Sequence, residues 1–213
     1  VCDGIGFAKR RDIVVVTINY RLGFFGFFAH PELTEEGGGT SGNYALYDIR
    51  EACLWVKENI AAFGGDPNRI TVAGQSGGAA ATGALHASPL MKDVIQRVSI
   101  ESGPIYWGFM QPGPRNKMEE FGEEYMKYIG CKSIEELRKK DAWELFDKYE
   151  EFQRSKGVGP MGFGFTFCVD GEFIPMQDIV AVKYHKMADC RYRGQCNEGA
   201  ESQQCMLETI DFS

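Results

Sequence analysis

Residues 69–78 of the chain read RITVAGQSGG, and this stretch decides the fold. A β-branched run that leads directly into Gly-x-Ser-x-Gly predicts a strand, a sharp turn and then a helix, with Ser76 at the tip of the turn. We expect the glycines two before and two after the serine, Gly74 and Gly78, to approach each other so closely that a side chain would clash. The pattern therefore predicts an exposed Ser76 in a strained backbone conformation, which is the arrangement of a nucleophile elbow.

The segments around this turn alternate between strand-like and helix-like patterns. Residues 12–20 (DIVVVTINY) form a near-continuous β-branched run, typical of a parallel strand that is buried on both faces. Residues 44–61 place apolar side chains at helical spacing, residues 77–86 predict a small-residue helix, and residues 97–101 predict a further strand. This order, with short connections, predicts an α/β fold with a mostly parallel, doubly wound sheet.

The rest of the chain adds loops and a helical excursion to this sheet. Residues 21–39 are predicted to be a Gly- and Phe-rich loop, because neither a helix nor a strand would keep the Gly-Gly-Gly at its end. A helical excursion is expected over about residues 112–165, as a candidate cap over the site. A turn is expected at Asp170-Gly171. The remaining predicted elements are helices at 117–129, 133–139, 141–155 and 176–186 and a strand near 190–194.

Residues 63–78 (FGGDPNRITVAGQSGG) closely resemble the active-serine signature of type-B carboxylesterases, the cholinesterase-like branch of α/β-hydrolases. Other stretches match this family in the same order along nearly the whole chain, most weakly over 112–165. They are 19–23 (NYRLG), 41–44 (SGNY) with Asp48, 55–56 (WV) with 59–60 (NI), 101–103 (ESG) and 169–171 (VDG). The resemblance implies an α/β-hydrolase fold, of which residues 1–213 form a partial domain, and a serine hydrolase that acts on carboxylic esters through an acyl-enzyme.

The resemblance also implies roles for individual residues. Ser76 corresponds to the nucleophile, and the Gly77 N–H to a donor for the oxyanion of the tetrahedral intermediate. Residues 194–199 (GQCNEG) resemble the family's Gly-x-x-x-Asp-Glu-Gly stretch, although they are one residue short and carry Asn in place of Asp. Glu198 is thereby interpreted as the triad acid, with Glu201 as the alternative. After the ESG stretch, Trp107 and Phe109 would line a substrate pocket, and packing in the core or cap is an equal alternative.

Two parts of the family's catalytic machinery are absent from the sequence. The family places a His-Gly-Gly oxyanion loop before the first strand, where this chain has only residues 1–11, and a catalytic histidine after the acid, where this chain has none. His30, His86 and His185 are interpreted as surface or capping residues. Because a serine hydroxyl without a base stays protonated at neutral pH, we expect the chain to be a fragment that is inactive alone.

The composition excludes several classes of partner. With 25% charged residues and a net charge of −7, the chain lacks the basic face that nucleic acid requires. No apolar run approaches the roughly 20 residues of a membrane span. The partner implied is a small-molecule ester; the oligomeric state is open.

The seven cysteines lack metal-ligand spacing, even at Cys190, Cys196 and Cys205, so we predict unpaired thiols, no metal and no cofactor. Unpaired thiols favour a cytoplasmic location; secretion stays possible, because we expect the N-terminus to be missing.

Two alternatives remain open at this point. One is a non-catalytic binding or adhesion protein on the same fold, because a fold does not dictate a function. The retention of Ser76 with both flanking glycines favours an enzyme over this alternative. The other is a truncated pseudoenzyme. Continuation of the reading frame beyond Ser213 into a segment with a histidine would separate it from an esterase.

Overall fold

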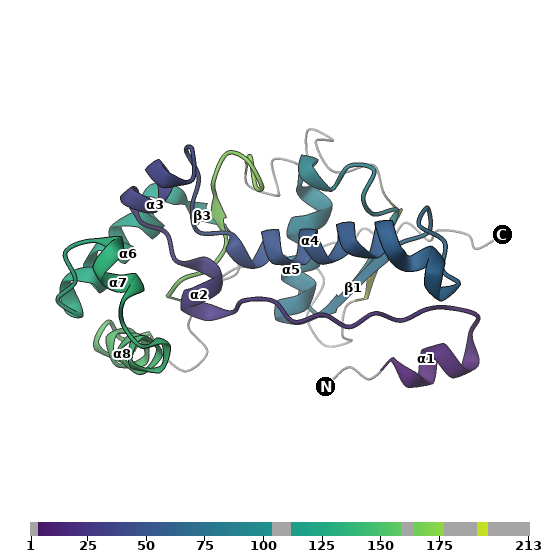
Figure 1. The fold of residues 1–213 in the computed structure, drawn as a ribbon, viewed down its shortest axis with the longest axis horizontal. Helices are drawn as coiled ribbons and strands as arrows, with labels where there is room; N and C mark the ends of the chain where they lie inside the picture. Colours follow the sequence, from purple (N-terminus) through teal and green to yellow (C-terminus); the bar gives the residue numbers. More distant parts are fainter. Residues whose placement is uncertain (1–3, 104–111, 159–163, 177–190, 196–213) are drawn as a thin grey trace. The chain divides into compact units, whose positions relative to one another are not determined.

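A computed structural model describes residues 4–103, 112–158 and 164–176, and the backbone of residues 191–195 (Figure 1). The chain divides into two compact units. The first unit contains the sheet and comprises residues 1–20, 47–104 and 186–213. The second unit is mainly helical and comprises residues 21–46 and 105–185.

The sheet unit is built on three parallel strands in the order β1 (Thr71–Gln75), β2 (Arg97–Glu101) and β5 (Arg191–Gln195). Helix α5 (Gly77–Ala87) connects β1 to β2 and packs against both strands. The buried residues of α5 are almost all Ala, Gly or Thr, and such small side chains let the helix lie close to the sheet. The predicted parallel α/β arrangement is confirmed in this unit.

The predicted helix at 44–61 is present as α4 (Tyr44–Asn59) and continues into a short 3₁₀ turn at Ile60–Phe63. Gly64 follows with φ 82°, and a left-handed residue at this place ends a helix without the steric cost of a side chain. The same unit contains α1 (Ile5–Arg10) and a second 3₁₀ turn at Pro89–Met91.

Residues 12–20 are extended but do not form the predicted strand. Their apolar side chains are open to solvent: Ile13 is 49% exposed, Val14 41% and Val16 42%. A strand is held by the N–H and C=O groups of a neighbour, and among the described residues no strand pairs with this segment. The β-branched pattern indicates which residues suit a buried strand. The pattern does not indicate whether a partner strand is present, and for that reason the prediction of a strand over residues 12–20 is wrong.

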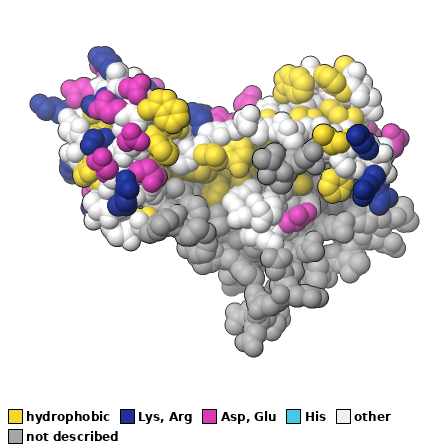
Figure 2. Space-filling view, turned by 90° about the horizontal axis from the view of Figure 1, so that it is seen from below, with side chains coloured by type: hydrophobic (Ala, Val, Ile, Leu, Met, Phe, Trp, Pro, Cys, Tyr) yellow, Lys and Arg dark blue, Asp and Glu magenta, His cyan; other side chains and the backbone are white. Residues whose placement is uncertain are grey.

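The helical unit contains five helices and one pair of two-residue strands among its described residues. They are α2 (Gly23–Phe27), α3 (Pro31–Glu36), α6 (Arg115–Tyr128), α7 (Ile134–Arg138) and α8 (Ala142–Ser155), with β3 (Gly113–Pro114) parallel to β4 (Cys168–Val169). The last three helices agree with the predicted excursion. Figure 2 shows acidic and basic side chains interspersed over α7 and α8, where exposed pairs such as Lys148–Glu151 lie at 2.7 Å. The role of these helices as a cap stays a prediction.

Helices α2 and α3 correct the prediction of a loop over residues 21–39. Phe24 in α2 and Phe28 directly after it are buried in an aromatic core, and this burial outweighs the low helix propensity of the glycines. In α3, Pro31 occupies the first turn, where its missing N–H costs nothing, and His30 caps the N-terminus. The glycine-rich composition predicts a loop correctly only at the end of the segment, at the Gly-Gly-Gly that follows α3.

Aromatic rings form the core of the helical unit. The ring centroids of Phe24 and Phe28 lie 4.7 Å apart, and Phe24 also contacts Tyr125 at 5.0 Å. The two buried tyrosines keep their hydroxyl groups satisfied: Tyr125 Oη donates to the Leu145 carbonyl at 2.7 Å, and Tyr149 Oη accepts from the Phe165 N–H at 2.9 Å. Burial raises the pKa of Tyr149 to about 12, so this phenol stays protonated at neutral pH.

A buried amide joins two of the sequence stretches that match the carboxylesterase pattern. Asn43 Nδ2 donates to the Cys168 carbonyl and to Asp170 Oδ2, both at 2.8 Å, and Asn43 Oδ1 accepts from the Cys168 N–H at 3.1 Å. Asp170 Oδ1 in turn accepts from the N–H groups of Glu172 and Ile174, which closes the predicted turn. The SGNY and VDG stretches therefore act together to hold segments that are far apart in the chain.

Replacing Asn43 with leucine is expected to lower the free energy of unfolding by about 3–5 kcal/mol, because it removes three buried hydrogen bonds and leaves the Asp170 carboxylate without this donor. Urea unfolding of the protein measures the loss. Asn59→Leu is the matched control, since the Asn59 amide is exposed and donates to the Trp55 carbonyl one turn earlier. Equal midpoints for the two variants would contradict a structural role for the network.

The three cysteines in the described residues, Cys53, Cys131 and Cys168, are buried free thiols. Burial raises the pKa of Cys53 to about 11 and that of Cys168 to about 12. A raised pKa lowers the thiolate fraction at neutral pH, and the thiolate is the nucleophile that attacks an alkylating agent. We therefore expect iodoacetamide to leave all three unmodified in the native protein and to modify them in urea, as read by peptide mass spectrometry. Rapid native alkylation of Cys168 would contradict its burial.

In the part of the chain that the structure describes, none of the helices combines the length and the apolar character needed to cross a membrane.

Candidate active site

A single residue turns the chain from β1 into α5. Strand β1 ends at Gln75, helix α5 begins at Gly77, and Ser76 between them has φ 54° and ψ −117°. A non-glycine residue at such a positive φ costs about 1–3 kcal/mol, and it persists only where its surroundings impose it. The Ser76 N–H donates to the Glu101 carbonyl at 3.0 Å, and the Ser76 carbonyl accepts from the Ala80 N–H at 3.0 Å. The strained backbone conformation that the motif predicts is therefore present, and the two hydrogen bonds of the Ser76 backbone hold it in place.

The close approach behind the turn brings Gly74 against the backbone carbonyl of Gly78, and it leaves no room for a side chain at Gly74. A Cβ placed on Gly74 would overlap the Gly78 carbonyl group and lie 2.7 Å from Thr82 Oγ1, whereas a Cβ on Gly78 would meet no atom within 4 Å beyond the backbone of its own helix. The expectation of a clash at Gly78 is wrong, because it is the backbone carbonyl of Gly78, and not its Cα hydrogen, that faces β1. Of the two motif glycines, only Gly74 must be a glycine for steric reasons.

Gly103 is a further residue that supports the turn. A Cβ on Gly103 would lie 2.6 Å from the Ser76 carbonyl oxygen, and the preceding Ser102 has φ 56°. The end of β2 therefore folds against the back of the elbow. The elbow pattern itself carries no sign of this contact. Only the match of residues 101–103 to the carboxylesterase pattern pointed to this place.

The arrangement suits a nucleophile beside an anion site. Ser76 and Gly77 are exposed, and the Ser76 hydroxyl makes no capping hydrogen bond to α5. The Gly77 N–H belongs to the first turn of α5, where N–H groups have no partner within the helix, and the helix dipole favours negative charge at this end. A negatively charged oxygen that forms next to Ser76 can therefore be stabilised by α5.

Two of the three histidines, His30 and His86, lie in the described residues. His86 lies in the last turn of α5, nine residues after Gly77, which places it about 14 Å along the helix from the elbow. His30 Nδ1 accepts from the Glu32 N–H at 3.3 Å and caps α3. Burial lowers the pKa of His30, so its ring is mostly neutral at pH 7. Of the two alternatives predicted for His30, a surface or a capping residue, the structure shows the second: the side chain caps α3, and only 7% of the residue is exposed.

The other predicted site residues lie outside the described residues. They are Glu198 and its alternative Glu201, Trp107, Phe109, His185 and the cysteines Cys190, Cys196 and Cys205. Their roles stay predictions from the sequence.

Comparison with known proteins supports the resemblance. The profile of the Carboxylesterase family matches residues 2–197. The chain is 37% identical over 173 residues to Fumonisin B1 esterase of Sphingopyxis macrogoltabida, covering 77% of this chain and 30% of that protein. It is 34% identical over 211 residues to Bile salt-activated lipase of Rattus norvegicus, covering 92% of this chain and 32% of that protein.

Solved structures show the same relationship. The carboxylesterase EST55 of Geobacillus stearothermophilus aligns with a TM-score of 0.76 and 32% identity, covering 90% of this chain and 38% of that one. A thermophilic PNB esterase aligns with a TM-score of 0.72 and 26% identity, covering 83% of this chain and 35% of that one. The α/β-hydrolase fold is thereby confirmed, and the chain spans about a third of the length of the relatives it matches. With a match over residues 2–197, the chain belongs to the carboxylesterase family.

Proposed function

We propose that the complete protein hydrolyses carboxylic esters through an acyl-enzyme formed on Ser76. The observation that carries this proposal is the exposed, strained Ser76 at the N-terminus of α5. Two of the matched relatives are named as an esterase and a lipase, which supports the reaction class. Because the chain spans about a third of their length, the activity is proposed for the complete protein encoded by the reading frame of this chain, called the complete protein below.

The proposed reaction follows from the groups at the elbow. Ser76 Oγ attacks the ester carbonyl carbon while a histidine from outside this chain, oriented by Glu198, takes its proton. The carbonyl oxygen becomes negative and accepts a hydrogen bond from the Gly77 N–H, an interaction typically worth about a hundredfold or more in rate. The tetrahedral intermediate collapses, and the alcohol leaves with the proton. Water then attacks the acyl group in the same way and releases the acid and Ser76. These steps need no metal and no organic cofactor.

The proposal is tested by rapid mixing of the complete protein with p-nitrophenyl acetate. We expect a burst of about one equivalent of nitrophenol per chain, followed by slower steady release, since acylation by an activated ester outruns deacylation. Release no faster than in buffer, from a protein with a cooperative thermal transition, would reject the esterase. It would favour the non-catalytic binding protein on the same fold.

A further inference from the structure

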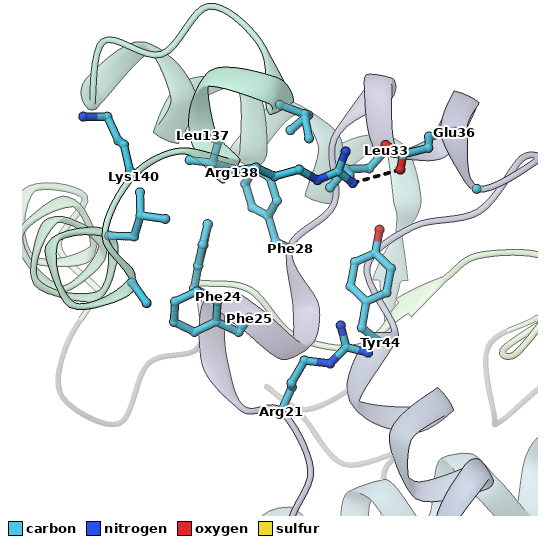
Figure 3. Close-up of a pocket in the computed structure, with 14 residues that line it drawn as sticks. Arg21, Phe24, Phe25, Phe28, Leu33, Glu36, Tyr44, Leu137, Arg138 and Lys140 are labelled. Carbon is cyan, nitrogen blue, oxygen red and sulfur yellow. Dashed lines mark hydrogen bonds and ion pairs between the residues drawn. The ribbon is translucent and has the colours of Figure 1, made fainter.

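A cavity of about 570 Å³ opens in the helical unit, between α2 and α3 on one side and α7 and α8 on the other. Its volume falls within the range typical of small-molecule sites. Most of the lining is apolar, and Figure 3 shows the rings of Phe24, Phe25 and Phe28 gathered along one flank, with the ring of Tyr44 opposite. A flat apolar group would be held between aromatic surfaces in this space.

The charged residues of the lining are mostly basic, although the chain as a whole carries a net charge of −7. Among the described residues, Arg21, Arg138 and Lys140 line the cavity together with one carboxylate, that of Glu36. In Figure 3, Arg21 and Arg138 approach from opposite ends of the space between the phenylalanines and Tyr44. The guanidinium carbon of Arg21 lies 5.4 Å from the centroid of the Tyr44 ring. The cavity therefore combines aromatic walls with an excess of positive charge.

We propose that this cavity binds a small organic acid, with a flat apolar body between the aromatic walls and its carboxylate on Arg138. A guanidinium is the side chain best suited to a carboxylate, because it offers paired donors in one plane. Aryl acids of this kind are also products of ester hydrolysis. The binding itself does not depend on the proposed function, since it uses no group of the elbow.

The Glu36 carboxylate occupies the position that the ligand carboxylate would take. Arg138 Nη2 lies 2.9 Å from Glu36 Oε1, and the two side chains are 56% and 57% exposed. An ion pair this exposed contributes little to stability, so Arg138 can exchange Glu36 for a ligand at little cost. Glu36 thus competes with the ligand for Arg138. Removal of the Glu36 carboxylate should therefore strengthen ligand binding, whereas removal of the Arg138 guanidinium should weaken it.

Naphthoate is a suitable probe, because it is flat, apolar and carries one carboxylate. Calorimetric titration into the complete protein is expected to show one saturable site, at which the uncharged naphthamide binds at least about tenfold more weakly. Equal affinities for the acid and the amide would overturn the proposal. The Ser76→Ala protein should bind naphthoate unchanged, so a failed esterase assay and a failed titration are separate results. Protection of Ser76 from fluorophosphonate labelling by naphthoate, at the concentration that saturates the titration, would place the ligand at the elbow and overturn the proposal.

Two variants of the ion pair locate the site. Arg138→Gln is expected to weaken naphthoate binding about tenfold, and Glu36→Gln to tighten it severalfold. The neighbouring pair Lys139–Glu135, at 2.5 Å and more exposed, does not line the cavity, so Lys139→Gln and Glu135→Gln are matched controls that should change nothing. All four changes are at exposed positions and should leave the melting temperature nearly unchanged. A shift in the same direction for Arg138→Gln and Glu36→Gln, or shifts equal to those of the controls, would overturn the assignment.

Discussion

Replacement of Ser76 with alanine is expected to lower kcat for p-nitrophenyl ester hydrolysis by about five to six orders of magnitude in the complete protein. The loss is this large because the covalent route disappears with the hydroxyl, while the oxyanion donors and the substrate-binding surface remain. The fold should survive, since the Ser76 hydroxyl makes no capping bond and the side chain is exposed. Steady-state kinetics on purified protein measures the effect.

Ser102→Ala is the matched control for this experiment. Ser102 is also a serine at the end of a strand, and its φ of 56° is close to the 54° of Ser76. The residue after it, Gly103, lies against the Ser76 backbone and is not helical, whereas the residue after Ser76 begins α5 and its anion site. We expect Ser102→Ala to keep activity within a few-fold of the unchanged protein. More than a few per cent of activity left in Ser76→Ala would show that another group is the nucleophile.

Gly74→Ala is expected to lower the free energy of unfolding by about 3 kcal/mol and to reduce turnover about a hundredfold. The added methyl group would overlap the Gly78 carbonyl group and crowd Thr82 Oγ1, so α5 must move away from β1. A shift of the first turn of α5 also displaces the Gly77 N–H from the oxyanion. Chemical denaturation and ester hydrolysis, measured on the same preparation, report the two losses.

The same substitution four residues later provides the comparison. Gly78→Ala adds a methyl group that meets no atom beyond its own helix within 4 Å, and alanine favours a helix over glycine by up to about 1 kcal/mol. We therefore expect unchanged or slightly higher stability and nearly full activity. If Gly78→Ala proved as damaging as Gly74→Ala, the asymmetric contact at the elbow would be refuted.

The sequence predicted the elements whose local pattern agrees with their tertiary surroundings. Strand β2 lies at the predicted residues 97–101, and α5 begins at Gly77 as expected, because a β-branched run and a small-residue helix meet at a glycine-flanked turn. The sequence pattern gave the wrong prediction where the structure of a segment depends on what packs or pairs with it in the fold. Residues 12–20 have the composition of a buried strand, but the described residues hold no strand that pairs with them. Phe24 and Phe28 make a helix of a Gly-rich segment because an aromatic core buries them.

The part of the site that consecutive residues form could be predicted from the sequence. Ser76, its positive φ and the helix that follows it come from five consecutive residues of one motif. The support from Gly103 and Glu101 comes from a different strand, and no periodicity in the sequence connects it to the serine. The Asn43–Asp170 bond joins residues 127 positions apart, which only the folded chain brings together. The cavity around Arg138 likewise depends on residues of five helices, α2, α3, α4, α7 and α8, that meet only in the fold.

The most direct test of the account is the intact mass of the complete protein after exposure to a fluorophosphonate, which reacts with an activated serine. We expect one adduct per chain, mapped to Ser76 by peptide mass and absent from Ser76→Ala. The 213-residue chain alone should remain unmodified, since no histidine follows Glu198 in it. An adduct that persists in Ser76→Ala, or a folded complete protein without any adduct, would contradict the assignment of Ser76 as the nucleophile.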